Sequence, residues 1–113
     1  MHIKNLTKKT LLAKNARLCK NILSKCLGLM FSKPQSLIFI FKKEKIVPLH
    51  MFFVFYPIDV LFLDNNKIVV EKKENFMPFS FYTPKNKALY IIELPKNTTK
   101  SSKTKVGNKI DFK

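Results

Sequence analysis

The stretch that decides the fold is residues 46–64, IVPLHMFFVFYPIDVLFLD, which is almost wholly apolar. Two prolines, Pro48 and Pro57, interrupt it. Because proline donates no backbone hydrogen bond, sheets tolerate it mainly at strand starts, edges and bends. The stretch therefore predicts two apolar strands that meet at Pro57. Both faces of each strand are apolar, so we expect other parts of the chain to cover both.

Apolar runs on either side of this stretch predict further strands. Residues 36–41, SLIFIF, combine β-branched and aromatic side chains, a composition typical of a buried strand, and residues 88–94, ALYIIEL, form a second such run. Residues 42–45 are charged and predict a turn, and residues 109–112 predict a short closing strand. Strands therefore dominate the chain.

The clearest local signal is Asn65-Asn66, which lies between the apolar runs DVLFLD and KIVVEKK. Two residues that tolerate positive φ between two such runs predict a two-residue β-hairpin. In that register Asp64 faces Lys67 and Asp59 faces Lys72. Opposite charges would then pair at both ends of the hairpin.

Residues 10–30 admit two interpretations. Six residues recur there at helical spacing: Leu12, Ala16, Cys19, Leu23, Cys26 and Met30. This stripe predicts one basic amphipathic helix, of the kind that lies on an anionic membrane. Alternatively, an extended segment at 11–19 precedes a short helix at 21–28 with Asn21 as its N-cap. Residues 1–9 are polar and basic, and we expect them to be a loosely ordered N-terminal segment, with an edge strand at Ile3 and Leu6 as the alternative.

The formal net charge of +15 invites a nucleic-acid interpretation. Arg17 is the one arginine, however, and arginine is the residue suited to bidentate recognition of bases and phosphates. The lysines run from Lys4 to Lys113 instead of forming one block. We therefore favour a solvated basic surface, with nonspecific nucleic-acid binding expected at low salt.

Several classes of protein are excluded or disfavoured by absent motifs. With two glycines in the chain, neither a P-loop nor a dinucleotide fingerprint can be built, and there is no G-x-S-x-G elbow, so we expect no cofactor. Cys19 and Cys26 are too far apart for a C-x-x-C pair, and we expect free thiols in a reducing cytoplasm. No signal peptide is evident, and Asp59 and His50 argue against a membrane-spanning helix at 46–64.

Asp59 is the leading candidate for a functional residue, because it follows the Pro57 bend at the head of an apolar strand. A carboxylate there must be hydrogen-bonded or paired, either with Lys72 or with backbone N–H groups. The functional alternative is a ligand-facing carboxylate at the mouth of a barrel, in a pocket with His50, Met51 and Met30. No residue spacing indicates a metal site.

Ordered segments along the chain resemble a known family. They are residues 28–31 (GLMF), 50–55 (HMFFVF), 57–60 (PIDV), 62–64 (FLD), 93–95 (ELP) and 106–108 (VGN). Their series is similar to the uncharacterised prokaryotic, archaeal-like family called domain of unknown function 192, over roughly residues 10–112. The resemblance implies a compact, mostly antiparallel, barrel-like β structure with a short helix near residues 20–29. Asn108 stands where the family usually has Asp, and Asn97 where a glycine is common.

The sequence thus predicts one mainly β (α+β) domain at 10–113, after the segment 1–9. We expect a small cytoplasmic protein that binds a ligand or a protein partner without catalysis. Two alternatives stay open. One is a small hydrolase or metal-dependent enzyme that uses His50 and Asp59, and the other is an electrostatic binder of nucleic acid or anionic membrane.

Overall fold

The computed structural model describes residues 1–19, 35–51 and 55–113. Strands make up most of the regular structure in these ranges, which confirms the mainly β class. The elements are β1 (Ile3–Asn5), β2 (Thr10–Ala13), β3 (Arg17–Cys19), β4 (Leu37–Lys45), β5 (Leu49–His50), β6 (Ile58–Leu63), β7 (Val69–Phe76), β8 (Phe81–Tyr82), β9 (Ala88–Pro95), α2 (Thr98–Ser101) and β10 (Ile110–Phe112).

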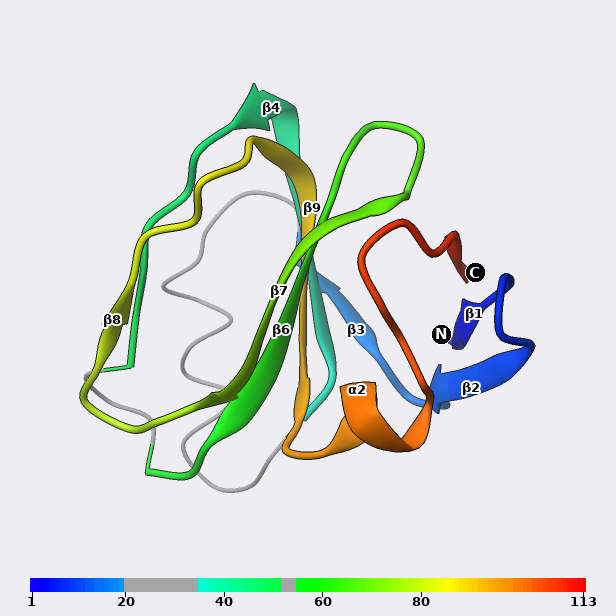
Figure 1. The fold of residues 1–113 in the computed structure, drawn as a ribbon, viewed down its shortest axis with the longest axis horizontal. Coiled ribbons are helices and arrows are strands. Elements are labelled where there is room, and N and C mark those ends of the chain that lie inside the picture. Colours follow the sequence, from blue (N-terminus) through cyan, green and yellow to red (C-terminus); the bar gives the residue numbers. More distant parts are fainter. Residues whose placement is uncertain (20–34, 52–54) are drawn as a thin grey trace.

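A five-stranded sheet in the order β3-β4-β9-β6-β7 runs through the middle of the molecule (Figure 1). Its pairs are antiparallel except β3 with β4, which is parallel. The small sheet β10-β1-β2 and α2 lie on one side, and the pair β5-β8 lies on the other. The described strands do not close into a barrel, because β3 and β7 end the central sheet without pairing to each other. The barrel-like expectation is therefore wrong.

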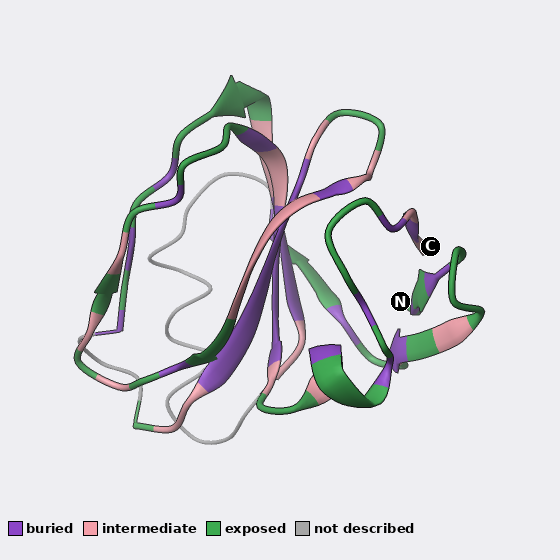
Figure 2. Ribbon diagram, in the orientation of Figure 1, coloured by how far each residue is buried: buried purple, intermediate pink, exposed green. Residues whose placement is uncertain are grey.

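The central sheet separates two hydrophobic cores. All six residues of β6 are buried (Figure 2), which confirms that both faces of this strand are covered. The first core contains Cys19, Leu37, Phe39, Val47, Leu49, Met51, Ile58, Val60, Phe62, Phe76, Ala88 and Ile91. The second core contains Ile3, Leu12, Ala16, Ile38, Leu61, Leu63, Val69, Ile92, Leu94 and Ile110. Neighbours along β9 thus alternate between cores, as the strand period of two requires.

The β6–β7 hairpin exists, but its predicted register is wrong. Leu63 faces Val69 and Leu61 faces Lys72, with bulges on the way to Ile58 and Phe76. The shift begins in the turn, where the Lys67 amide donates to the carbonyl of Asp64 at 3.0 Å and Lys67 itself has a φ of 61°. A turn followed by one left-handed residue adds a bulge that shifts the pairing by one residue, and the irregularities between Phe62 and Leu63 and between Ile58 and Val60 shift it further.

Residues 1–9 are not loosely ordered; they contain a strand at Ile3, as in the alternative interpretation, although it does not lie at an edge. β1 is the middle strand of its sheet and pairs with both β2 and β10. Ile3 is fully buried in the second core, and its burial fixes a segment whose overall composition is basic.

Residues 10–19 are extended, forming β2 and β3, so a helix over 10–30 is wrong and the membrane interpretation loses its main support. The short helix expected near 20–29 lies outside the described residues. A helical turn that was not predicted, α2, occurs at Thr98–Ser101. The charged turn predicted at 42–45 is also wrong, since β4 continues to Lys45.

Candidate functional site

Asp59 lies on β6, where it is buried and fully engaged by the chain itself. Its Oδ1 accepts the backbone N–H of Asn75 at 3.0 Å. Its Oδ2 accepts the backbone N–H of Thr99 at 3.0 Å and the Thr99 hydroxyl at 2.8 Å. Asp59 therefore ties β6 to the bulge of β7 and to α2, as expected for a buried carboxylate that satisfies backbone donors.

The predicted pairing of Asp59 with Lys72 is wrong. Lys72 faces Leu61 in the hairpin, and its ammonium lies 2.9 Å from Glu74. The register shifts at the turn and between Phe62 and Leu63 together move Lys72 away from Asp59. The capping of backbone N–H groups, which was the other structural expectation for Asp59, is what the structure shows.

The other residues of the predicted pocket are spread over the molecule. Met51 is buried in the first core, whereas Asp59 faces the second-core side, because its partner Leu94 belongs to that core. His50 is exposed on β5, opposite Phe81. Met30 lies outside the described residues. The structure does not bring Met51 and Asp59 together, and ligand binding by these residues stays a prediction.

A different carboxyl group is the more unusual one. Glu93 lies in the centre of β9, between Leu37 of β4 and Val60 of β6. Both neighbours belong to the first core, so the Glu93 side chain projects into that apolar layer. Glu93 is 5% exposed, and its Oε2 has no hydrogen-bond partner among the described residues. Burial raises the pKa of its carboxyl to about 7.

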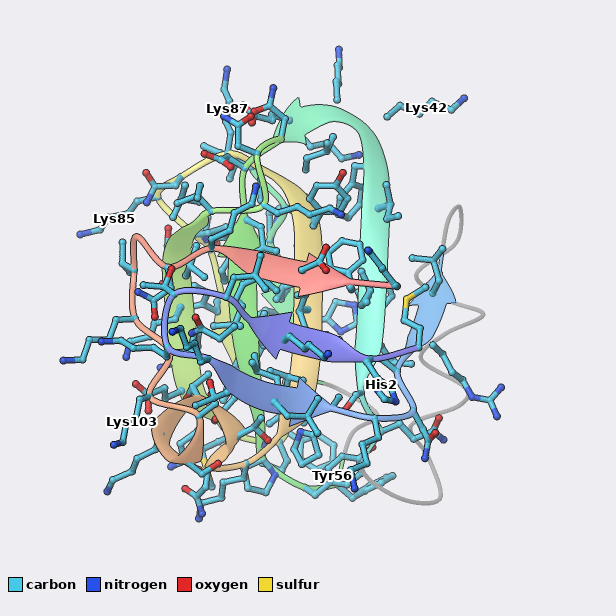
Figure 3. The ribbon with its side chains drawn as sticks, turned by 90° about the vertical axis from the view of Figure 1, so that its right-hand side faces the viewer. His2, Lys42, Tyr56, Lys85, Lys87 and Lys103 are labelled. Atoms are coloured by element: carbon cyan, nitrogen blue, oxygen red, sulfur yellow. The ribbon has the colours of Figure 1, made fainter. Side chains whose placement is uncertain are left out.

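Tyr56 shares this environment. It is half-buried and packs against the first core, near the Pro57 bend (Figure 3). Its pKa is raised to about 12, first by burial and then by the negative charge of Glu93. Met51 is part of the same core. The arrangement is an apolar layer that holds one carboxyl group, beside a phenol.

Such a carboxyl group can accept a hydrogen bond from a ligand or bind a cation, and near neutral pH it can take up or release a proton. A metal site receives no support, since no group of three His, Cys, Asp or Glu residues converges within the described ranges. Sequence reasoning did not single out Glu93 for this role. The available signal was one acidic residue inside the apolar run ALYIIEL.

Cys19 ends β3 and is buried in the first core. It is disulfide-bonded, and its partner lies outside the described residues. The expectation of a free thiol at this position is therefore wrong. No helix among the described residues has the length and apolar character needed to cross a bilayer.

The sheet order, the two cores and the buried carboxyl define a mainly β protein with an open central sheet. The chain belongs to the family described as Uncharacterized ACR, domain of unknown function 192, whose model matches residues 3–112. A UPF0127 protein of Pyrococcus horikoshii is 39% identical over 99 residues, which cover 85% of each chain. A UPF0127 protein of Pyrococcus furiosus is 35% identical over 111 residues, covering 96% of this chain and 95% of its own.

Two crystal structures share the fold. One is of a candidate transcription regulator from Sinorhizobium meliloti, with a TM-score of 0.82, 19% identity, and coverage of 97% of this chain and 89% of that chain. The other is of a protein of unknown function from Novosphingobium aromaticivorans, with a TM-score of 0.82, 16% identity, and coverage of 98% and 82%. At these identities the likeness supports the fold alone.

Proposed function

We propose that this protein is a non-catalytic binding module and that Glu93 contacts its ligand. The ligand would be a small molecule that presents a cationic group or a hydrogen-bond donor to the carboxyl group and apolar surface to the first core. Small-molecule sites commonly combine an apolar lining with a few placed polar groups.

The observation that carries the proposal is the buried, unpartnered Oε2 of Glu93 among the described residues. Buried polar atoms in folded proteins are almost always hydrogen-bonded, and leaving one unpaired costs about 1–3 kcal/mol. A leucine at this strand position would avoid that cost and would match its neighbours Leu37 and Val60. A carboxyl group retained at such a cost is best explained by a contact that the isolated chain does not make.

The enzyme alternative built on His50 and Asp59 has less support. Both oxygens of Asp59 accept hydrogen bonds from the chain, so this carboxylate is not available to act as a general base.

The test is native mass spectrometry of the protein after a high-salt wash. The variants are Glu93→Gln, which removes the ionisable group at nearly constant volume, and Asp111→Asn, a partly exposed carboxylate, as the control. A small molecule retained by the wild type and the control but lost from Glu93→Gln supports the proposal. A bare wild-type chain that also gains no thermal stability from small aliphatic amines or guanidinium compounds would contradict it.

The cellular location belongs to the same proposal. We propose the cytoplasm. The disulfide at Cys19 argues against this location unless the source organism is a hyperthermophile, because disulfides are otherwise uncommon in the cytoplasm, so the location needs its own test. Fractionation of cells of the source organism, followed by thiol alkylation without reductant, tests both points. Recovery of the protein outside the cytoplasmic fraction would contradict the proposed location.

A further inference from the structure

A second surface of the molecule carries a concentration of positive charge. A cavity of about 470 Å³ is lined by Lys8, Lys72, Glu74, Thr99, Lys100, Lys103 and Lys105. Its five lysines come from the turn after β1, from β7, and from α2 with the loop that follows it. Lysines that are scattered along the sequence thus meet in one place.

The charges in this cavity are not cancelled locally. Among the described lining residues Glu74 is the one acidic residue, and its pKa is lowered chiefly by its hydrogen bond to Lys72, so it stays ionised. Five ammonium groups against one carboxylate leave four net positive charges. Concentrated charge of one sign in a concave site attracts a multivalent counter-ion.

Buried and partly buried hydrogen bonds hold the loops that carry these lysines. The Asn5 side-chain amide donates to the Thr104 hydroxyl and to Asn108 Oδ1, each at 3.0 Å, and Asn5 Oδ1 accepts the backbone N–H of Lys8 at 2.9 Å. Asn108 Oδ1 also accepts the backbone N–H of Lys105 at 3.0 Å. The backbone of the cavity wall is therefore fixed across residues about a hundred positions apart in sequence.

Lys103 adds an independent observation. The amides of Lys103 and Thr104 donate to the carbonyls of Lys100 and Thr99, the Schellman pattern that ends a helix. Lys103 occupies the left-handed position of this motif, with a φ of 58°. Glycine is the usual residue there, because side chains are strained in that conformation. The side chain of Lys103 lines the cavity, and Figure 3 labels it beside α2.

We propose that this cavity binds an oligophosphate, a compact chain of phosphate groups that is either free or carried by a nucleotide. A lysine ammonium group acts as a point charge, so it can contact the closely spaced oxygens of a phosphate chain without a fixed geometry. A nucleic-acid strand fits less well, since the described residues that line the cavity include no arginine and no aromatic residue to read or stack bases. The size of the cavity is also that of a small-molecule site.

The test compares two triple variants of the full chain by titration calorimetry with inorganic triphosphate at fixed ionic strength. One variant changes Lys100, Lys103 and Lys105 to Gln. The control changes the exposed Lys42, Lys43 and Lys87 to Gln, which removes the same charge at another end of the molecule (Figure 3). Circular dichroism and thermal melting confirm that both variants fold.

We expect the cavity variant to lose at least about tenfold in affinity and the control less than about twofold, because exposed charge contacts are individually weak and act over short range. Adenosine triphosphate should bind about as tightly as triphosphate. Equal losses in both variants, or no binding by the wild type, would overturn the proposal. Tighter binding of a single-stranded oligonucleotide than of triphosphate would overturn it in favour of a nucleic-acid surface.

Discussion

Replacing Asp59 with alanine should destabilise the fold severely without changing any surface. The substitution removes the acceptor of three hydrogen bonds and leaves the Asn75 and Thr99 N–H groups and the Thr99 hydroxyl without it. A hydrogen bond to a charged group contributes about 1.5–3 kcal/mol, and such contributions are not additive when they share one acceptor. We therefore expect a loss of about 3–5 kcal/mol in the free energy of unfolding, against typical totals of about 5–15 kcal/mol.

Urea denaturation followed by circular dichroism measures this loss. With a slope of about 2 kcal/mol per molar urea, the midpoint should fall by about 2 M. Thr99→Val removes one of the three bonds while keeping the shape of the side chain, and should cost about 1 kcal/mol. Asp111→Ala removes a carboxylate that lies 4.0 Å from Lys67, and should cost less than about 1 kcal/mol.

The refuting result is a change below about 1 kcal/mol for Asp59→Ala, equal to that of Asp111→Ala. The three hydrogen bonds of Asp59 would then contribute little to stability, and the hypothesis that Asp59 faces a ligand would regain support. A large loss in Asp59→Ala and a small one in Thr99→Val together assign the carboxylate to the joint between β6, β7 and α2.

Two further predictions concern Glu93 and Lys103. Burial raises the pKa of Glu93 from 4.5 to about 7, so the folded state holds its proton where the unfolded state has lost it. The free energy of unfolding should therefore fall by up to about 3 kcal/mol, relative to that of Glu93→Gln, as the pH rises from 4.5 to about 7. Urea melts of both proteins across this pH range measure the difference, and parallel pH profiles would contradict the prediction. Lys103→Gly relieves a left-handed conformation and should stabilise the fold by up to about 1 kcal/mol while weakening triphosphate binding, whereas Lys103→Gln should weaken binding only. A loss of stability in Lys103→Gly would show that the positive φ of Lys103 does not destabilise the fold.

The central strands were predictable because their signal is local. β6 and β9 are apolar runs interrupted by one acidic residue each, and a run of this length with β-branched residues has few alternatives to a buried strand. β1 was expected only as an alternative edge strand, because it has three residues in a basic segment and its order depends on Ile3 meeting a core built from much later residues. The predicted hairpin register failed at the left-handed Lys67 and at two bulges further along β6 and β7, none of which strand propensity predicts.

The candidate sites were less predictable, because they depend on residues that are distant in sequence. Asp59 could be recognised as a residue that needs partners, but Asn75 and Thr99 lie 16 and 40 positions away. Glu93 was visible as an acidic residue in an apolar run, yet its lack of a partner depends on how β4, β9 and β6 pack. The lysine cavity could not be found from spacing, since its lysines range from position 8 to position 105.

The place of β9 between β4 and β6 also bears on how quickly the chain can fold. Its partner residues are separated widely in sequence, with Leu37 paired to Glu93 and Ile58 to Pro95. Closing the long loops between these residues costs conformational entropy before the strand pairs contribute any stability. Folding should therefore occur over milliseconds to seconds, as for other domains rich in non-local contacts. Until β9 docks, β4 and β6 each present an unpaired apolar edge, and aggregation competes with folding during that interval.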